Sequence, residues 1–349
     1  VYGGRMRRRS SFTDVWLLYR DIDPTSLRLQ QEEVAAVRWV TPDELIAMLR
    51  ERKFHHYGSA YFQFVFRAIE RGRRTLYVTD LDGTLLGPDG RVSAYTAETL
   101  DRLIARGMPI SVATARGTIG IELTQIGRIR FRLPLVMLGG VLLYDLGRRR
   151  ILHGCEMSAE TVGAVLRVFE ELGRHTMLFR RCGNEVHIYY TALNDAERLF
   201  VDRPAPDGRR FDRFFHQVSQ LRAAPALFFS CQGTREEQEQ LRRRLRAVPG
   251  IRAVLYRDDY LPDNWYLEIC REDATKDRGV ERLRRRVHAA RVVAFGDNDN
   301  DVPLLRSADL ALCVENGTAA AKAAADEIIR PNTEDGVARY LNAIYNRKV

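Results

Sequence analysis

The stretch DLDGTL, residues 80–85, directly follows the apolar run Leu76–Val78, and these two features together decide the fold. A short apolar run that ends in acidic residues is typical of a strand whose carboxyl end opens on a crevice. On an extended backbone Asp80 and Asp82 place two carboxylates at that end, and Gly83 lets the chain turn away. One carboxylate can attack phosphorus while the other transfers protons. An acidic corner between a strand and a turn explains such a pair equally well when it stands alone.

A second acidic stretch, GDNDND at residues 296–301, follows another apolar run, Val292–Phe295. Carboxylate and carbonyl oxygens are the ligands that Mg²⁺ prefers. The spacing does not match a calcium-binding loop, because no glutamate stands at the required distance. An exposed acidic turn is the alternative, but the pairing with residues 80–85 favours a magnesium site.

Thr114 and Lys276 stand at the ends of two further regular segments. Thr114 follows the apolar run Ile110–Ala113, where its hydroxyl can donate a hydrogen bond to a phosphoryl oxygen. Lys276 precedes a stretch with apolar residues at helical spacing, where it can place a cation near the same oxygens. Each residue alone is typical of an ordinary turn or a solvated helix start. Their order and their positions at element ends favour a phosphate site.

Short apolar runs alternate with amphipathic helices from Thr75 onward, which predicts an α/β fold with a doubly wound parallel sheet. The runs expected to be strands are Leu76–Val78, Ile110–Ala113, Leu135–Met137 and Val292–Phe295. A helix that begins after Ser93 is expected to stop at Gly107, because glycine readily takes the left-handed conformation of a C-terminal cap.

This alternation is interrupted between Leu152 and Asp273 by a segment with helices and strands of its own. Ser158 begins one predicted helix, and the capping box Thr234–Glu237 begins another. The expected strands are Met177–Phe179, Val186–Tyr190, Ala253–Tyr256 and Trp265–Ile269. We therefore predict a catalytic core of residues 73–151 and 269–349, an inserted α+β cap of residues 152–268, and a separate segment of residues 1–72.

The motifs at residues 80–85, Thr114, Lys276 and residues 296–301, in this order, resemble the signature of the haloacid dehalogenase superfamily. Residues 325–337 resemble the closing region of its Cof-like, type IIB branch, and the insertion resembles that branch's large α/β cap. The resemblance covers residues from about 75 to the end of the chain. It implies a phosphatase that uses Mg²⁺ to hydrolyse a small phosphorylated metabolite, a sugar phosphate or a similar compound, through an aspartyl-phosphate intermediate.

The resemblance also assigns catalytic and phosphate-binding roles, residue by residue. It makes Asp80 the nucleophile and Asp82 the general acid and base. It places Thr114, Lys276 and Asn300 at the phosphoryl group.

The metal site follows from the same resemblance. Asp80, the backbone carbonyl of Asp82, and Asp297 would hold Mg²⁺. Asp301 would complete this site, and Asn300 would help to orient it.

Two departures from the family pattern concern the substrate. Ala115 stands where relatives often have glycine, and Leu138-Gly139-Gly140 replaces their usual Asn-Gly-Ala. The missing asparagine leaves the catalytic assignments intact, but the substrate of a relative should not be assigned to this chain. The cap offers candidates that could face the substrate, although exposed surface is the commoner place for such residues: Arg180, Arg181, His187 and Tyr189.

Residues 1–72 carry ordered elements of a different kind. Strands are expected at Asp14–Tyr19 and Val37–Val40, and Thr41 with Glu44 forms a capping box before a helix. Asp14–Leu17, Glu32–Val34, Trp39–Thr41 and Asp43–Leu45 resemble the latter half of a Nudix hydrolase domain. The metal-binding helix that defines such a domain would lie upstream of Val1, so no pyrophosphohydrolase chemistry is assigned. A bifunctional Nudix and phosphatase fusion is one alternative.

Composition and charge restrict the remaining function classes. With 45% hydrophobic and 29% charged residues, the chain is expected to be globular and soluble. The net charge of +9 comes from scattered arginines. The densest arginine runs, Arg242–Arg246 and Arg282–Arg286, fit solvated helix faces, so no nucleic-acid partner is predicted. No apolar run approaches the ~20 residues of a membrane span, so no membrane partner is predicted either. The five cysteines lack metal-ligand spacing, and a cytoplasmic location is expected.

Other activities stay open at this stage. A phosphotransferase or mutase of the same superfamily would pass the phosphoryl group to a second substrate in place of water. A non-catalytic or nucleic-acid-binding module would be favoured by loss of either Asp80 or Asp82, and both are present. The oligomeric state is not predicted.

Overall fold

The computed structural model describes residues 2–7, 12–16, 23–26, 28, 32, 37–53, 58, 60–65, 75–117, 120–121, 124–202, 212–214, 224–257, 261 and 263–346. The chain divides into two compact units. The first comprises residues 1–75 with 288–291, and the second comprises residues 76–287 with 292–349. None of the helices among the described residues is long and apolar enough to cross a membrane.

The first unit contains a short hairpin and one regular helix. Strand β1 (Tyr2–Arg7) pairs antiparallel with β2 (Phe12–Trp16), and η1 (Pro24–Ser26) and α1 (Pro42–Arg50) follow. The predicted capping box is confirmed, because Glu44 N donates to Thr41 Oγ1 and Thr41 N donates to Glu44 Oε2.

Two strand predictions in this unit have different outcomes. The strand at residues 37–40 is wrong, since these residues take no regular structure. A stretch with strand-favouring residues forms a strand only where a partner strand satisfies its backbone groups. The other predicted strand begins inside β2, and its residues 17–19 lie outside the described part of the chain, as do Leu17, Glu33 and Val34 of the Nudix-like pattern.

A five-stranded sheet in the order β16-β15-β14-β3-β4 lies at the core of the second unit. Its strands are β3 (Thr75–Thr79), β4 (Ile110–Val112), β14 (Arg291–Gly296), β15 (Leu310–Val314) and β16 (Glu327–Ile329). The pairs β3/β4, β14/β15 and β15/β16 are parallel. Leu76, Val78, Val112 and Leu312 are fully buried, as a parallel sheet covered on both faces requires. The predicted α/β fold with a parallel sheet is confirmed.

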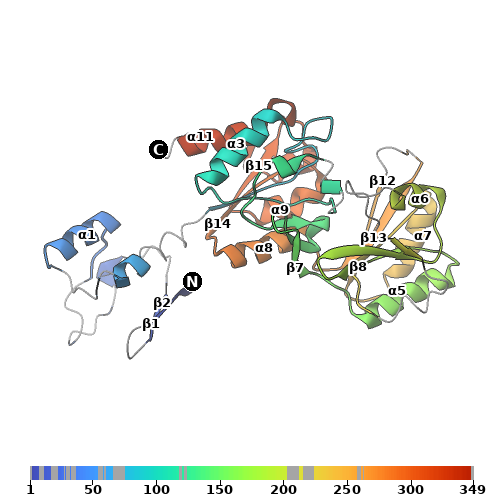
Figure 1. Ribbon diagram of the computed structural model, residues 1–349, viewed down its shortest axis with the longest axis horizontal. Helices are drawn as coiled ribbons and strands as arrows, with labels where there is room; N and C mark the ends of the chain where they lie inside the picture. Colours follow the sequence, from blue (N-terminus) through green and yellow to red (C-terminus); the bar gives the residue numbers. More distant parts are fainter. Residues whose placement is uncertain are drawn as a thin grey trace. The chain divides into compact units, whose positions relative to one another are not determined.

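Helices cover both faces of this sheet, with α3 and α11 on one side and α8 on the other (Figure 1). The helices are α3 (Ala94–Ala105), α8 (Lys276–Val287), α9 (Val302–Ser307), α10 (Ala319–Ala323) and α11 (Gly336–Asn346). The boundaries predicted for α3 are confirmed, because Ser93 caps its start and Gly107 follows its end with φ +93°.

The run Leu135–Met137 forms a strand, but the predicted place of that strand in the sheet is wrong. It is strand β5 of an antiparallel sheet with β6 (Leu142–Asp145) and β7 (Arg150–Gly154). A single parallel bridge from Val136 to Ala113 joins β5 to the end of β4. Residues 138–140 all have positive φ values, and this left-handed turn folds the chain back on β5 instead of continuing into a crossover helix.

A second sheet interrupts the core between β7 and α8, and we call it the inserted sheet. Its order is β10-β9-β8-β11-β13-β12. Its strands are β8 (Met177–Cys182), β9 (Glu185–Tyr190), β10 (Asp212–Phe214), β11 (Phe228–Gly233), β12 (Ile251–Arg257) and β13 (Trp265–Arg271). Helices α5 (Ala159–Glu171), α6 (Asp195–Val201) and α7 (Arg235–Leu245) belong to the same segment. The strands predicted within β8, β9, β12 and β13 are confirmed.

One face of the inserted sheet is covered by α5 and α7. Phe169 of α5 and Leu241 of α7 are buried against Phe229 and Leu267, which alternate with residues of the opposite face. The opposite face carries Phe228, whose ring stacks on that of Phe179 with centroids 4.1 Å apart.

Candidate active site

Strands β3 and β14 bring the two acidic stretches together at their carboxyl ends. Asp80 N donates a hydrogen bond of 3.0 Å to Phe295 O, so the first residue after β3 is held at the carboxyl end of β14. The side chains of Asp80, Asp297 and Asp301 are all buried, with residue exposures of 5%, 9% and 0%. A parallel sheet places its ligand sites at this edge.

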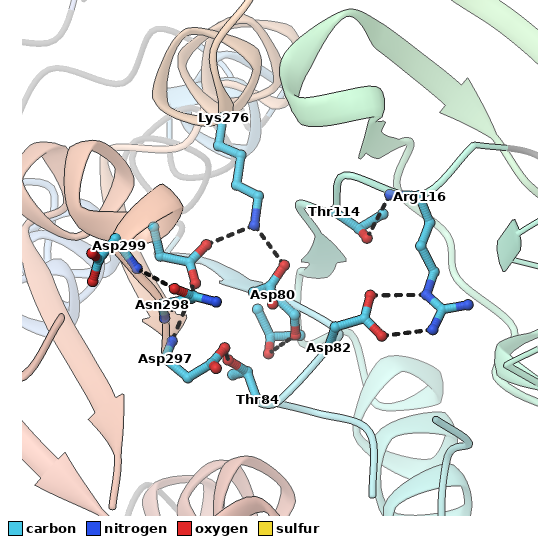
Figure 2. A network of polar contacts seen from close by, with 11 residues as sticks. Asp80, Asp82, Thr84, Thr114, Arg116, Lys276, Asp297, Asn298 and Asp299 are labelled. Atoms are coloured by element: carbon cyan, nitrogen blue, oxygen red, sulfur yellow. Dashed lines mark hydrogen bonds and ion pairs between the residues drawn. The ribbon is translucent and has the colours of Figure 1, made fainter. Parts of the chain in front are cut away.

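Lys276 connects the two acidic stretches from above the sheet edge (Figure 2). Its Nζ donates to Asp80 Oδ1 and to Asp301 Oδ1, both at 2.6 Å. Burial lowers the pKa of Lys276, but the two carboxylates outweigh burial and hold this pKa above its ordinary value. Lys276 is therefore a permanent cation at the centre of the site.

One lysine does not balance the negative charge of three carboxylates. Carboxylate oxygens of Asp80, Asp297 and Asp301 lie within 4.8 Å of one another. Burial and repulsion from Asp301 and Asp297 outweigh Lys276 and raise the pKa of Asp80 to about 8. Burial, together with repulsion from Asp301, also raises the pKa of Asp297 to about 6. Hard oxygen donors with this excess of charge fit a divalent cation such as Mg²⁺.

The loop after β3 packs closely on Asp297. Thr84 Oγ1 donates to Asp297 Oδ1 at 2.6 Å. Gly83 has φ +78°, and a Cβ at this position would lie 2.3 Å from Asp297 Oδ2, so only glycine fits. Thr318 N also donates to the carbonyl of Asp297, at 2.7 Å. These contacts fix the orientation of the Asp297 carboxylate, which is what a metal ligand needs.

Asp301 is held by its own loop. Its Oδ2 accepts hydrogen bonds from the backbone N–H groups of Asp297 and Asn298, at 3.2 and 3.1 Å. One oxygen therefore orders the loop while the other accepts from Lys276. Asn300 lies on the short helical turn η5 (Asp299–Asp301) with an exposed side chain, and its assignment to phosphate stays a prediction.

Asp82 has a different environment from Asp80. Arg116 donates to both of its carboxylate oxygens, from Nε to Oδ2 at 2.8 Å and from Nη2 to Oδ1 at 2.7 Å. The side chain of Asp82 remains 50% exposed. Figure 2 shows this carboxylate directed toward Arg116, whereas Asp80 is directed toward Lys276.

Thr114 lies fully buried at the end of β4, on the same side of the site as Arg116. Its Oγ1 accepts from Arg116 N at 3.1 Å, so its own hydroxyl hydrogen can point to a ligand. Its carbonyl accepts from Gly139 N at 2.9 Å, which ties the β4 end to the turn after β5.

Residues 77–341 match the family of haloacid dehalogenase-like hydrolases. The chain belongs to this family. A putative phosphatase of Mycoplasma pneumoniae is 24% identical over 282 residues, which are 76% of this chain and 95% of that protein. A crystal structure of a Thermotoga maritima protein superposes with a TM-score of 0.63 at 20% identity, covering 77% of this chain and 97% of the other. A sugar phosphatase of haloacid dehalogenase subclass IIB superposes with a TM-score of 0.57 at 20% identity, covering 78% and 98%.

The predicted superfamily is confirmed by the family match, and its type IIB branch stays a prediction. The family match begins at residue 77, so the Nudix-like resemblance of residues 1–72 stays a prediction. In this haloacid dehalogenase-like hydrolase, the fold brings Asp80, Lys276, Asp297 and Asp301 into one cluster. It leaves the Asp82 side chain outside that cluster, on Arg116.

Sequence reasoning missed two contacts that shape the site. Arg116 follows Thr114 by two residues, but an isolated arginine in an arginine-rich chain carries no local signal of its partner. Thr84 lies inside the DLDGTL stretch, yet its partner Asp297 is 213 residues away in the sequence. The motif itself was the only signal that could have indicated Thr84.

Proposed function

We propose that this haloacid dehalogenase-like phosphatase uses Mg²⁺ to hydrolyse a small phosphorylated metabolite, a sugar phosphate or a similar compound, through an aspartyl phosphate on Asp80. The predicted enzyme class, a phosphatase of this superfamily, is confirmed by the family match and by phosphatases among the relatives. The observation that carries the finer proposal is the buried cluster in which Lys276 bridges Asp80 and Asp301 beside Asp297.

The carboxylates of Asp80, Asp297 and Asp301 would hold Mg²⁺, with the backbone carbonyl of Asp82. Bound there, the ion would offset the negative charge of the carboxylates and of the phosphoryl oxygens. Lys276 and the hydroxyl of Thr114 would contact the phosphoryl oxygens from the other side. Without such neutralisation, an anionic nucleophile and a phosphate dianion repel each other.

In the first step an oxygen of Asp80 attacks phosphorus, forming an acyl phosphate while the bond from phosphorus to the leaving oxygen breaks. Asp82 donates a proton to that leaving oxygen. In the second step Asp82 removes a proton from water, whose oxygen attacks the same phosphorus and regenerates the Asp80 carboxylate with release of inorganic phosphate.

Asp82 must leave Arg116 to perform these proton transfers. The Asp82 side chain is half exposed, so water can replace Arg116 as its hydrogen-bond partner during this exchange. We propose that residues 152–268 act as a cap on a core of residues 73–151 and 269–349. Substrate binding beneath the cap would then exclude bulk water.

The experiment that tests this function is rapid-quench labelling with a ³²P-labelled substrate in Mg²⁺. Asp80→Asn should remove both turnover and the labelled protein. Asp82→Asn should reduce turnover by about 10²- to 10⁴-fold, the usual range for a lost acid or base. With an activated leaving group the Asp82 variant should accumulate label on Asp80.

Asp89→Asn serves as the matched control, because Asp89 is exposed on the next turn and should keep full activity. Label mapped to Asp82, serine or histidine would contradict the assignment. Release of inorganic phosphate in equal amount to the alcohol separates hydrolysis from transfer to a second substrate.

A further inference from the structure

Arg252 of the inserted sheet lies against a loop of the parallel-sheet core. It stands on the edge strand β12, opposite Cys270 of β13. Its Nε donates to Cys270 Sγ at 3.3 Å. Its Nη2 lies 3.6 Å from the position that a Cβ would take on Gly139, an ordinary van der Waals contact. The guanidinium therefore reaches from one sheet to the turn that follows β5.

That turn borders both predicted phosphate-binding residues. Gly139 N donates to the carbonyl of Thr114 at 2.9 Å. The next residue, Gly140, packs so tightly on the carbonyl of Thr275 that a Cβ would lie 2.0 Å from it. Thr275 directly precedes Lys276. Arg252 is thus placed at the rim of the site, one residue layer away from the groups that would hold the phosphoryl group.

Arg252 forms no ion pair with a carboxylate in the described part of the chain, and its side-chain hydrogen bond goes to the thiol of Cys270. The negative group with which it interacts is Glu268, two positions before Cys270 on β13. Arg252 lowers the pKa of Glu268, but burial outweighs this effect and raises that pKa above its ordinary value. Burial raises the pKa of the Cys270 thiol, so this neighbour stays neutral. By contrast, Arg116, Arg271 and Arg282 each pair with an aspartate at 2.7–2.9 Å.

A partly buried guanidinium that forms no ion pair is costly, because it has lost water and Glu268, whose pKa burial raises, offsets only part of its charge. Arg252 uses its Nε on Cys270, which leaves the two Nη groups as a fork toward the rim. Such a fork matches the two oxygens of a carboxylate or a phosphate. Three of the four cap candidates considered from the sequence, Arg180, His187 and Tyr189, do not offer this, because they share the face of Leu178, which packs on α5 and α7. The fourth, Arg181, lies on the other face, but its guanidinium donates to the carbonyls of Gly183 and Ile151.

We propose that Arg252 binds a second oxyanion, a carboxylate or a phosphate, on the leaving group of the substrate. The inference rests on the proposed function, because it takes the leaving group to extend from Asp80 toward the inserted sheet. It narrows the substrate class to phosphate monoesters that carry another anionic group. Arg252 is in this view a specificity-determining residue and takes no part in bond breaking.

The test compares kcat/KM for substrate pairs that differ only in the second oxyanion. 3-Phosphoglycerate against glycerol 3-phosphate examines a carboxylate, and fructose 1,6-bisphosphate against fructose 1-phosphate examines a phosphate. For the preferred pair, we compare kcat/KM for the substrate with the second oxyanion to kcat/KM for the substrate without it. Arg252→Gln should lower this ratio by about 10- to 100-fold, the range for a charge-assisted hydrogen-bonded pair. Arg252→Lys should lower it less, since it keeps the charge and loses the fork.

Arg257→Gln is the control, because it removes the same charge from the exposed end of the same strand and should leave the ratio unchanged. A wild-type enzyme that cleaves p-nitrophenyl phosphate but does not prefer either substrate with a second oxyanion would overturn this inference and leave the proposed function standing. So would an unchanged ratio in Arg252→Gln. A folded wild-type enzyme without turnover of any ester would overturn the proposed function and this inference with it.

Discussion

Gly140 is the position where one methyl group should disturb both stability and the site. Its φ is +105°, and a Cβ would lie 2.0 Å from Thr275 O and 2.3 Å from Thr275 C. An ordinary contact begins at 3.4 Å, so the atoms must separate by 3.4 − 2.0 = 1.4 Å. Both of the crowded atoms belong to the backbone, which cannot swing away as a side chain can.

The cost of Gly140→Ala is the sum of two effects. Holding alanine in a left-handed conformation costs about 1–2 kcal/mol, and forcing an extra methyl group into packed structure costs about 1–3 kcal/mol. We expect the free energy of unfolding to fall by about 2–5 kcal/mol. The carbonyl of Thr275 also accepts from Gly279 N at 2.8 Å, so the first turn of α8 must move, and Lys276 with it. A displacement of roughly 1 Å at such a residue can lower kcat about 100-fold.

Gly107→Ala is the matched control for conformation without crowding. Gly107 has φ +93°, and nothing lies within 4 Å of its Cβ position. It should lose about 1–2 kcal/mol of stability and keep full activity. Urea denaturation gives the stabilities, and kcat is measured on the folded fraction of each variant. If Gly140→Ala resembles Gly107→Ala in both measurements, the tight contact at Thr275 is not what positions Lys276.

Two further predictions concern the charges of the site. Affinity for Mg²⁺, measured by titration calorimetry, should rise from pH 6 to pH 8. The pKa values of Asp297 and Asp80 are raised to about 6 and about 8, so at low pH the ion must displace protons from these carboxylates, and at higher pH those protons are already lost. An affinity that does not change with pH, or full turnover in excess EDTA, would contradict the metal site. Lys276→Met should lower the free energy of unfolding by about 3–5 kcal/mol at pH 8 in EDTA and lower kcat at least ~100-fold, because it leaves buried carboxylates without their cation. Its control, Lys53→Met, breaks an exposed pair with Glu51 and should cost at most about 1 kcal/mol, and equal losses in the two variants would refute this account.

The sequence predicted the elements whose signal is local. The run before Asp80 and the run before Asp297 are β3 and β14, because parallel strands buried on both faces must be apolar throughout. The caps at Thr41, Ser93, Ser158 and Thr234 were also predictable, since each satisfies N–H groups only three residues away.

The errors arose where the structure depends on distant partners or unusual backbone. Residues 37–40 have strand-like composition but no regular structure. Leu138 has φ +51°, a value that leucine seldom takes. The residue types at this position therefore did not predict the turn that makes β5 antiparallel to β6. The pairing of Arg116 with Asp82 spans 34 residues, and only the folded chain reveals it.

The connection between the inserted sheet and Lys276 suggests how leaving-group recognition could reach the reaction centre. Arg252 pairs in register with Cys270 on β13, and β13 ends at Arg271, five positions before Lys276. Between them Asp273 accepts from Arg271 at 2.7 Å and from Arg282 of α8 at 2.9 Å, which clamps the connection to the core. A short, clamped connection transmits displacement instead of absorbing it, so an oxyanion that holds Arg252 would also hold Lys276 in place. The Asp273→Asn variant, which weakens the clamp without touching either site, should therefore reduce the preference for charged substrates in the same direction as Arg252→Gln, by a smaller factor.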